Sequence, residues 1–247
     1  MTRFLYLIIA SLLLAAGTAV ASAQDSDPAG ISFRVLRVIY PEAEKNGVSL
    51  TAYNSTPEAY LMQSWVRPVD PTTGDVDLHA QGQPAMPFVV TPPLARLEAN
   101  GELALRIRRS DVPLPTDRES VFFISMKAMP QQQQELKQGK MVMTVVSNLK
   151  LFYRPAGLSK RAVEEMAPKL TFQREGNRLV ASNPTPYWLT FSHLAVAGVE
   201  LGKSDLRLMV PPFGQQSYPL PASPQGKVTW KLIDEDGWDT PVAQQAL

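Results

Sequence analysis

Apolar and polar residues alternate along most of the chain from Ile31 onward, in short runs that Pro, Gly and Asn interrupt. Successive side chains of a β-strand point to opposite faces, so alternation with period two predicts strands with one buried face. Leu103, Leu105 and Ile107 show this alternation most clearly. Helical periodicity is weak, and its best candidate is a turn or two over residues 159–166. The pattern therefore predicts an all-β sandwich protein.

The predicted strands form two series, separated by a hinge that includes Pro155 and Gly157. The first series comprises residues 32–40, 48–54, 60–67, 102–108, 121–126 and 141–153, and the second comprises residues 170–174, 178–182, 187–193, 206–210 and 227–233. Short strands broken by turn residues are typical of sandwiches. We predict two sandwich domains of unequal size, residues 24–155 and residues 156–247.

Residues 1–23 have the features of a secretory signal peptide. Arg3 precedes an apolar run over residues 4–16, and Ala21 and Ala23 are small residues suited to a cleavage site. A transmembrane anchor is the alternative, but the apolar run is short for a span of about 20 residues. We predict cleavage after Ala23, export, and no stable insertion of the mature chain in a membrane.

Charge and composition argue against several classes of function. The 247 residues include 24 Lys and Arg against 23 Asp and Glu, a formal net charge of +1. A nucleic-acid-binding protein needs a larger basic excess to neutralise phosphates, so we expect no nucleic acid as a partner. Cys is absent, which excludes disulfides, thiol catalysis and thiolate metal sites. His79 and His193 are the only histidines, too few for most zinc enzymes, and we expect no cofactor or metal.

The best enzymatic motif is a relaxed phosphate-loop pattern over residues 197–204, with Ala197 where the stricter form has Gly and with Lys203 near its end. A phosphate loop leads into a helix, whereas residues 205–210 alternate like a strand. We therefore interpret the segment as a β-turn. The histidines belong to no zinc-protease pair, no serine lies in a nucleophile elbow, and the neighbouring acids of residues 234–236 do not face each other. These observations predict a protein that is not an enzyme.

Residues 141–153 form a long apolar stretch after a polar loop. Met141, Met143 and Val145 fall on one face of the predicted strand, and further apolar residues fall on the other face. A strand that is apolar on both faces is either central in a sheet or an edge that docks onto a partner. The pattern alone favours a central strand.

Five segments resemble the periplasmic pilus (fimbrial) assembly chaperones of the PapD-like family. They are, in family order, residues 37–41 (Arg-Val-Ile-Tyr-Pro), 91–97 (Thr-Pro-Pro-Leu-Ala-Arg-Leu), 117–120 (Asp-Arg-Glu-Ser), 148–155 (Asn-Leu-Lys-Leu-Phe-Tyr-Arg-Pro) and 183–187 (Asn-Pro-Thr-Pro-Tyr). The resemblance covers nearly the whole mature chain. It implies two immunoglobulin-like sandwiches set at an angle, with a cleft between them, in a periplasmic protein.

The resemblance also implies binding roles. Arg37 and Lys150 match the cleft pair that grips the C-terminal carboxylate of a pilin subunit. Met141, Met143 and Val145 match the residues that complete the subunit's fold by donor-strand complementation, a form of β-strand addition. The implied partners are pilin subunits and an outer-membrane usher. On this basis the long strand is an edge, and the shortness of the loop at residues 130–140 resembles the short-loop branch of the family.

The family's interdomain charge network maps onto Glu119, Arg154 and Glu235, although an Asp is usual at the third position. A regular strand would point Lys150 and the odd-numbered anchors to opposite faces, so either a bulge or a cleft that contacts both faces is needed. The chain also lacks the cysteine pair that many relatives carry in the second domain.

Two other functions fit a β-sandwich. A pilus structural subunit or adhesin would carry an alternating N-terminal extension, but residues 24–30 are polar and small. A carbohydrate-binding module would cluster its aromatic residues, whereas Trp65, Trp188, Trp230 and Trp238 are scattered, the first three in strand-like runs typical of a core.

Overall fold

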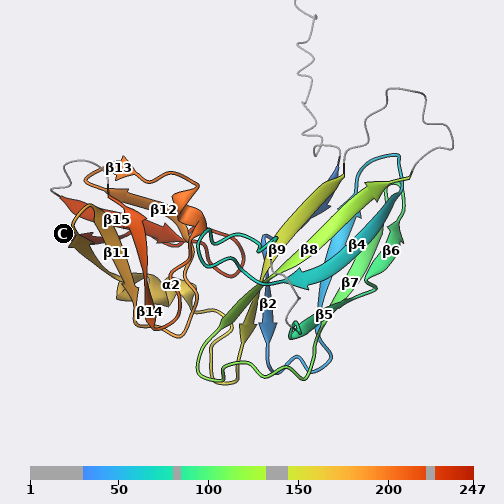
Figure 1. Cartoon of the computed structure of the whole chain (residues 1–247), viewed down its shortest axis with the longest axis horizontal. Helices are drawn as coiled ribbons and strands as arrows, with labels where there is room; N and C mark the ends of the chain where they lie inside the picture. The colour runs from blue at the N-terminus through green and yellow to red at the C-terminus, as the bar shows by residue number, and fades with distance from the viewer. Residues whose placement is uncertain (1–29, 80–84, 132–143, 221–225) are drawn as a thin grey trace, which may run out of the picture.

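The computed structural model describes residues 30–79, 85–131, 144–220 and 226–247. Buried and exposed residues alternate along the strands, and this alternation is why the strands form layers around a core. In strand β4 (Tyr60–Arg67), for example, Met62, Ser64 and Val66 are buried while Leu61 and Gln63 are exposed. Each such strand turns one face to a core, and the chain forms two β-sandwiches that follow one another along its longest axis (Figure 1).

The first domain packs a sheet of four strands against a sheet of five. The four-stranded sheet has the order β1 (Ile31–Phe33), β3 (Val48–Asn54), β7 (Glu102–Arg109), β5 (Phe88–Thr91). The five-stranded sheet has the order β2 (Arg37–Pro41), β9 (Val145–Arg154), β8 (Ser120–Pro130), β4, β6 (Leu94–Leu97). All pairs are antiparallel except β2 and β9, which are parallel. Tyr40, Phe88, Leu105, Ile124 and Leu151 lie in the core between the sheets.

The second domain packs a sheet of three strands against a sheet of four. The first has the order β10 (Thr171–Glu175), β11 (Arg178–Asn183), β14 (Gly214–Pro219), and the second β13 (Val199–Glu200), β12 (Phe191–Val196), β15 (Lys227–Leu232), β16 (Ala243–Ala246). Helix α2 (Val163–Met166) and two single turns, η2 (Ala167–Lys169) and η3 (Asp205–Arg207), complete it. Phe172, Phe191 and Trp230 form an aromatic cluster in its core.

The predicted strands at residues 48–54 and 60–67 match β3 and β4, but three other predictions are wrong. The stretch 32–40 is two strands in different sheets, β1 and β2. In the stretch 187–193 the strand, β12, begins only at Phe191, and its pairing with β15 shifts register between Phe191 and His193. The stretch 206–210 is no strand, because η3 ends at Arg207 and Val210 makes only an isolated bridge to Leu189. Leu206 and Leu208 reach the second core from this turn, so alternation there reflects burial without strand pairing.

The domains meet through contacts from several elements. The loop that includes Gly74 packs against η3, where a Cβ on Gly74 would lie 2.4 Å from the carbonyl oxygen of Arg207. Arg207 Nη1 also donates to Asp75 Oδ2 at 3.0 Å. Trp188, predicted as core, lies at this junction instead: its indole Nε1 donates to the backbone oxygen of Glu119 at 3.1 Å.

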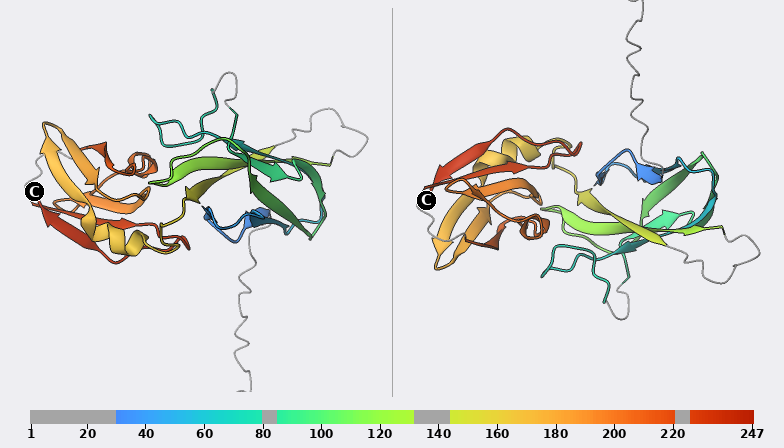
Figure 2. Two further views of the ribbon diagram at one scale, coloured as in Figure 1. Left: turned by 90° about the horizontal axis from the view of Figure 1, so that it is seen from below. Right: turned by 90° about the horizontal axis from the view of Figure 1, so that it is seen from above.

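Strand β9 leads into the junction between the two domains. β9 runs through the first domain toward the second, and its last residues continue into the linker (Figures 1 and 2).

Within the residues that the structure describes, no helix is both long and apolar enough to cross a membrane.

Candidate binding site at the domain junction

Arg37 and Lys150 lie side by side on the first domain. They are register partners in the parallel pair of β2 and β9. Leu149 and Leu151 point into the core, so Lys150 between them points to the opposite, outer face of the sheet, and its partner Arg37 points the same way. The sheet thus presents two cations together where β2 begins.

The guanidinium of Arg37 is buried, since only 8% of this residue is exposed. Its Nη1 donates to the backbone oxygen of Ile233 in the second domain at 3.0 Å, and its Cζ lies 5.3 Å from the centroid of the Phe152 ring. No described residue accepts a hydrogen bond from its Nε. Burial lowers the pKa of Arg37 to about 10, although the carboxylates of Glu235, Glu119 and Asp234 oppose this shift. Arg37 is therefore a charged group with N–H donors that no described residue uses.

Lys150 is half-buried and takes part in none of the ion pairs among the described residues. Burial and the neighbouring Arg37 lower the pKa of Lys150 to about 8, while Asp75 raises it slightly. Bringing two cations together in a partly desolvated place costs free energy unless an anion joins them. The pair is therefore suited to bind a carboxylate.

Arg154 lies four residues after Lys150 on β9, and each nitrogen of its guanidinium has an acceptor. Its guanidinium donates to Glu119 through Nε, to Glu235 through Nη2 at 2.7 Å, and to the backbone oxygen of Ser159 through Nη1 at 2.9 Å. Glu119 also accepts from the backbone N–H of Trp188 at 2.8 Å. Burial alone would lower the pKa of Arg154, but the two carboxylates outweigh it and raise the pKa. The structure thus brings Glu119, Arg154 and Glu235 together across the junction.

β9 is a central strand along one half and an edge along the other. β8 pairs with residues 145–153 of β9, whereas β2 pairs only with residues 150–154. The edge of residues 145–149 that faces away from β8 has no strand partner among the described residues. Val145 and Val146 at this edge are 59% and 46% exposed. The pattern-based preference for a wholly central strand is therefore wrong for this half.

Of the three predicted donor residues, the structure places Val145, whereas Met141 and Met143 lie outside the described residues. Pairing of β9 with β8 is regular from Val145 to Tyr153, with no bulge. Val145 and Lys150 consequently point to opposite faces of the sheet. A partner that uses both must contact the edge and the outer face together.

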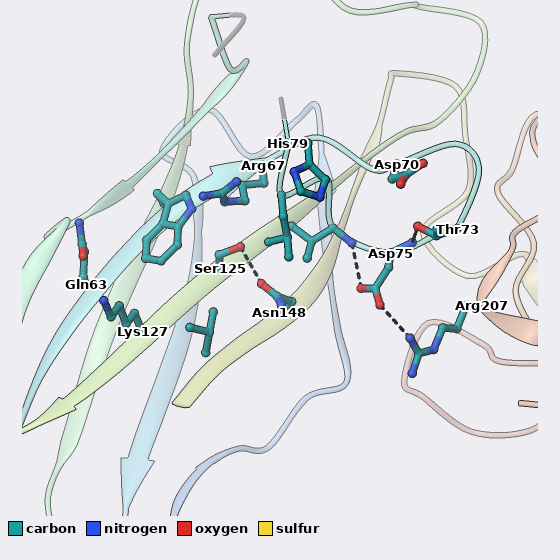
Figure 3. A pocket seen from close by; sticks show the side chains of 14 residues that line it. Gln63, Arg67, Asp70, Thr73, Asp75, His79, Ser125, Lys127, Asn148 and Arg207 are labelled. Atoms are coloured by element: carbon teal, nitrogen blue, oxygen red, sulfur yellow. Dashed lines mark hydrogen bonds and ion pairs between the residues drawn. The ribbon is translucent and has the colours of Figure 1, made fainter. Parts of the chain in front are cut away.

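A pocket of about 1050 Å³ lies on this outer face (Figure 3). β4, β8 and β9 form its floor, where Ser125 Oγ donates to Asn148 Oδ1 at 2.7 Å. Asp75 and Arg207 bridge the two domains at one side of it (Figure 3). The sequence analysis missed this bridge, because its members are 132 positions apart and no pattern links them.

The segments considered for catalysis have structural roles. Ala197 and Gly198, with φ of 50° and 81°, form the tight turn between β12 and β13, so the phosphate-loop pattern begins with a hairpin turn. His193 Nδ1 lies 3.4 Å from Glu200 Oε1 across this hairpin, and His79 is exposed. No group of three or more potential metal ligands occurs among the described residues.

The fold and the site define a two-domain, immunoglobulin-like protein with an open strand edge beside a pair of cations, which is an arrangement for binding an extended chain. Comparisons with known proteins specify the class further. Residues 30–159 match the model of the "Pili and flagellar-assembly chaperone, PapD N-terminal domain", and residues 165–244 match "Pili assembly chaperone PapD, C-terminal domain". The chain belongs to this family of pilus assembly chaperones.

Individual relatives agree. The chain is 35% identical to the chaperone protein FimC of Escherichia coli K12, over 86% of this chain and 83% of FimC. It is similar in structure to the E. coli chaperone DraB, with a TM-score of 0.73, 36% identity, and coverage of 88% of this chain and 98% of DraB. A chain of the Salmonella enterica SafA pilin–SafB chaperone complex gives a TM-score of 0.76 at 28% identity, covering 90% of this chain and 98% of that chain. The function is that of a pilus assembly chaperone, in place of the structural subunit or carbohydrate-binding module considered above.

Proposed function

We propose that this chaperone holds a pilin subunit by two linked contacts, strand addition at the open edge of β9 and capture of the subunit's C-terminal carboxylate by Arg37 and Lys150. The observation that carries the proposal is the position of the cation pair. Lys150 lies directly after the open edge of residues 145–149, at the point where β2 begins to cover β9. An extended segment paired with this edge can therefore place its terminal carboxylate beside both cations.

The carboxylate contact is well matched to the environment of Arg37. Its guanidinium makes one hydrogen bond to the described residues, from Nη1 to Ile233, so other N–H groups remain from which a carboxylate can accept. Hydrogen bonds to charged groups contribute about 1.5 to 3 kcal/mol each. Two such bonds supply about 3 to 6 kcal/mol, near the low end of the ~4 to 15 kcal/mol that association costs, so tight binding also needs the strand contact.

The donor residues of this proposal are Met141, Met143 and Val145. The exposure of Val145 at an unpaired edge supports it, and Met141 and Met143 continue the same alternation upstream. Burial of three such side chains would contribute about 5 to 9 kcal/mol, at ~1.5 to 3 each. Because strand faces alternate, a slip of one residue would turn all three away from the subunit, so carboxylate capture also fixes the register.

The remaining assignments belong to the same proposal. The chain is exported to the periplasm, and residues 1–23 are removed as a signal peptide after Ala23. Residues 24–155 form the domain that carries the donor strand, residues 156–247 form the second domain, and the network of Glu119, Arg154 and Glu235 holds the two together. The chaperone delivers its subunits to an outer-membrane usher and acts by binding, without catalysis.

The proposal is tested with one peptide in two forms. A synthetic peptide with the C-terminal sequence of a pilin subunit from the same bacterium is prepared with a free carboxylate and with an amide. We expect the amide to bind the wild-type chaperone at least about tenfold more weakly, the equivalent of one lost charge-assisted hydrogen bond. Equal dissociation constants in isothermal titration calorimetry would refute carboxylate capture.

A further inference from the structure

A turn of the second domain reaches across the junction to Arg37. This turn, residues 233–239, follows β15, and its first carbonyl, that of Ile233, accepts the hydrogen bond from Arg37 Nη1 at 3.0 Å. Gly237, with φ of 92°, lies against Leu36: a Cβ on it would be 2.9 Å from Leu36 Cδ1. The turn therefore contacts both Arg37 and the residue that precedes it in the chain.

The turn is itself held in one conformation. Asp234 Oδ1 accepts from the backbone N–H groups of Asp236 and Trp238 at 2.9 and 2.8 Å. The backbone N–H of Asp234 donates to the oxygen of Trp238 at 2.8 Å, and that of Ile233 donates to the oxygen of Thr190 at 2.9 Å. The peptide group that carries the Ile233 carbonyl and the peptide group before it are thus both hydrogen-bonded, which fixes the direction of the acceptor that Arg37 meets.

A long arginine side chain otherwise has many rotamers, and ordering it on binding costs conformational entropy. Ile233 uses one donor of Arg37, the Nη1 group, and the rest of the guanidinium makes no hydrogen bond to a described residue. The bond thus orients the guanidinium before a ligand arrives.

We propose that the 233–239 turn is the positioning element for Arg37, so that the second domain sets the geometry in which an arginine of the first domain meets the subunit's carboxylate. This inference rests on the proposed role of Arg37 in carboxylate capture. Asp234 is its critical side chain, because that carboxylate closes the turn through two backbone N–H groups. Asp234 acts through the turn and does not touch the ligand.

Electrostatic attraction between Asp234 and Arg37 is the competing explanation, and a pair of substitutions separates the two. Asp234→Asn keeps the accepting Oδ1 but removes the charge, whereas Asp234→Ala removes both. Asp236→Ala is the matched control, because Asp236 belongs to the same turn but its side chain pairs with the exposed Arg161 at 2.6 Å. If charge were decisive, the Asn and Ala variants of Asp234 would behave alike.

The measurement is the ratio of the dissociation constants of the amidated and free-carboxylate peptides for each full-length mature variant. We expect Asp234→Ala to reduce this ratio by at least about threefold, while Asp234→Asn and Asp236→Ala retain the wild-type ratio. The amidated peptide should bind all four proteins about equally, which a general loss of structure would not allow. Equal ratios in the Ala variant and the wild type, or equal losses in the Ala and Asn variants, would overturn the positioning role.

A second variant covers the case in which Asp234→Ala does not fold. Gly237→Ala strains the left-handed residue of the turn and pushes on Leu36, so it should reduce the ratio as well. An unchanged ratio in a folded Gly237→Ala protein would also count against the proposal. If the amidated and free-carboxylate peptides bind the wild type equally, carboxylate capture itself fails. This result is distinct from a failure of the positioning role alone.

Discussion

Two groups of charged residues on β9 differ in how they are paired. Arg154 is surrounded by acceptors from both domains, whereas Lys150, four positions earlier on the same face, has no ion-pair partner among the described residues, and its neighbour Arg37 donates only to a backbone carbonyl. Buried charges are costly unless they are paired, and the first group is paired across the domain junction. Under the proposed function, the second group takes its partner from the subunit. The same residue chemistry would then serve structure or binding according to whether its partner lies within the chain.

The strongest test of this comparison is the loss of Arg154. Arg154→Ala leaves Glu119 and Glu235 without their common partner, and breaking a buried ion pair in this way costs about 3 to 5 kcal/mol. We expect a clear decrease in the free energy of unfolding, measured by urea titration. A change within the error of the method would mean that the network contributes little to stability.

The opposite result is expected for Lys150. Lys150→Ala removes a cation without a partner, so stability should change by less than about 0.5 kcal/mol or increase. Binding of the free-carboxylate peptide should weaken about tenfold or more. Both are measured on the same sample, by urea titration and calorimetry. A stability loss as large as that of Arg154→Ala would make Lys150 a structural residue.

The dependence of binding on pH sharpens the comparison. The pKa of Lys150 is lowered to about 8 by burial and by Arg37. In the free chaperone Lys150 is therefore charged below pH 8 and loses its proton above it, so affinity for the free carboxylate should be constant below pH 8. Above pH 8 it should fall by up to about tenfold per pH unit, because binding then requires uptake of a proton. Calorimetry between pH 6.5 and 9.5 measures this.

Lys150→Arg is the control for that profile, since an arginine stays charged throughout the range. Whatever its size, the affinity of this variant should not change with pH. A wild-type profile that is equally flat would show that Lys150 keeps its charge or does not contact the carboxylate.

The smallest effect is expected at Lys203, the lysine of the phosphate-loop pattern. Lys203→Ala should change neither stability nor peptide binding by more than about 0.5 kcal/mol, because this lysine lies between β13 and η3 outside the junction contacts described above. The wild-type protein should hydrolyse no ATP. Turnover that disappears in the variant would restore the enzymatic interpretation.

The sequence predicted those parts of the fold in which burial alternates. β3 and β4 were found with correct bounds, because every second residue faces the core. β14 was missed, since Gln215, Gln216 and Ser217 are polar, although the strand pairs with β11 and its Tyr218 is buried in the core. In the false strand at residues 206–210, Leu206 and Leu208 reach the core, but the backbone pairing is limited to the isolated bridge of Val210 to Leu189. Periodicity reports which side chains are buried, and it does not report which backbone groups pair.

The site, like the fold, was predicted only in part. Arg37 and Lys150 were found through a family resemblance, as no pattern in one sequence can show that residues 113 positions apart are register partners. The turn at residues 233–239 was considered only through its acids, as a row without facing groups and, at Glu235, as part of the charge network. Its contribution comes from a backbone carbonyl, which every residue has, so side-chain identity gave no signal.

The parallel pairing of β2 with half of β9 has a consequence for the length of any segment that the chaperone accepts. β2 and an added strand would lie in line along the same edge of β9, so the first residue of β2 blocks further growth of the added strand. The open edge of β9 then ends at a fixed position, because a partner segment whose chain continues beyond its last strand residue would collide with β2. This limit would select for segments that end at this point, before any particular side chain is recognised.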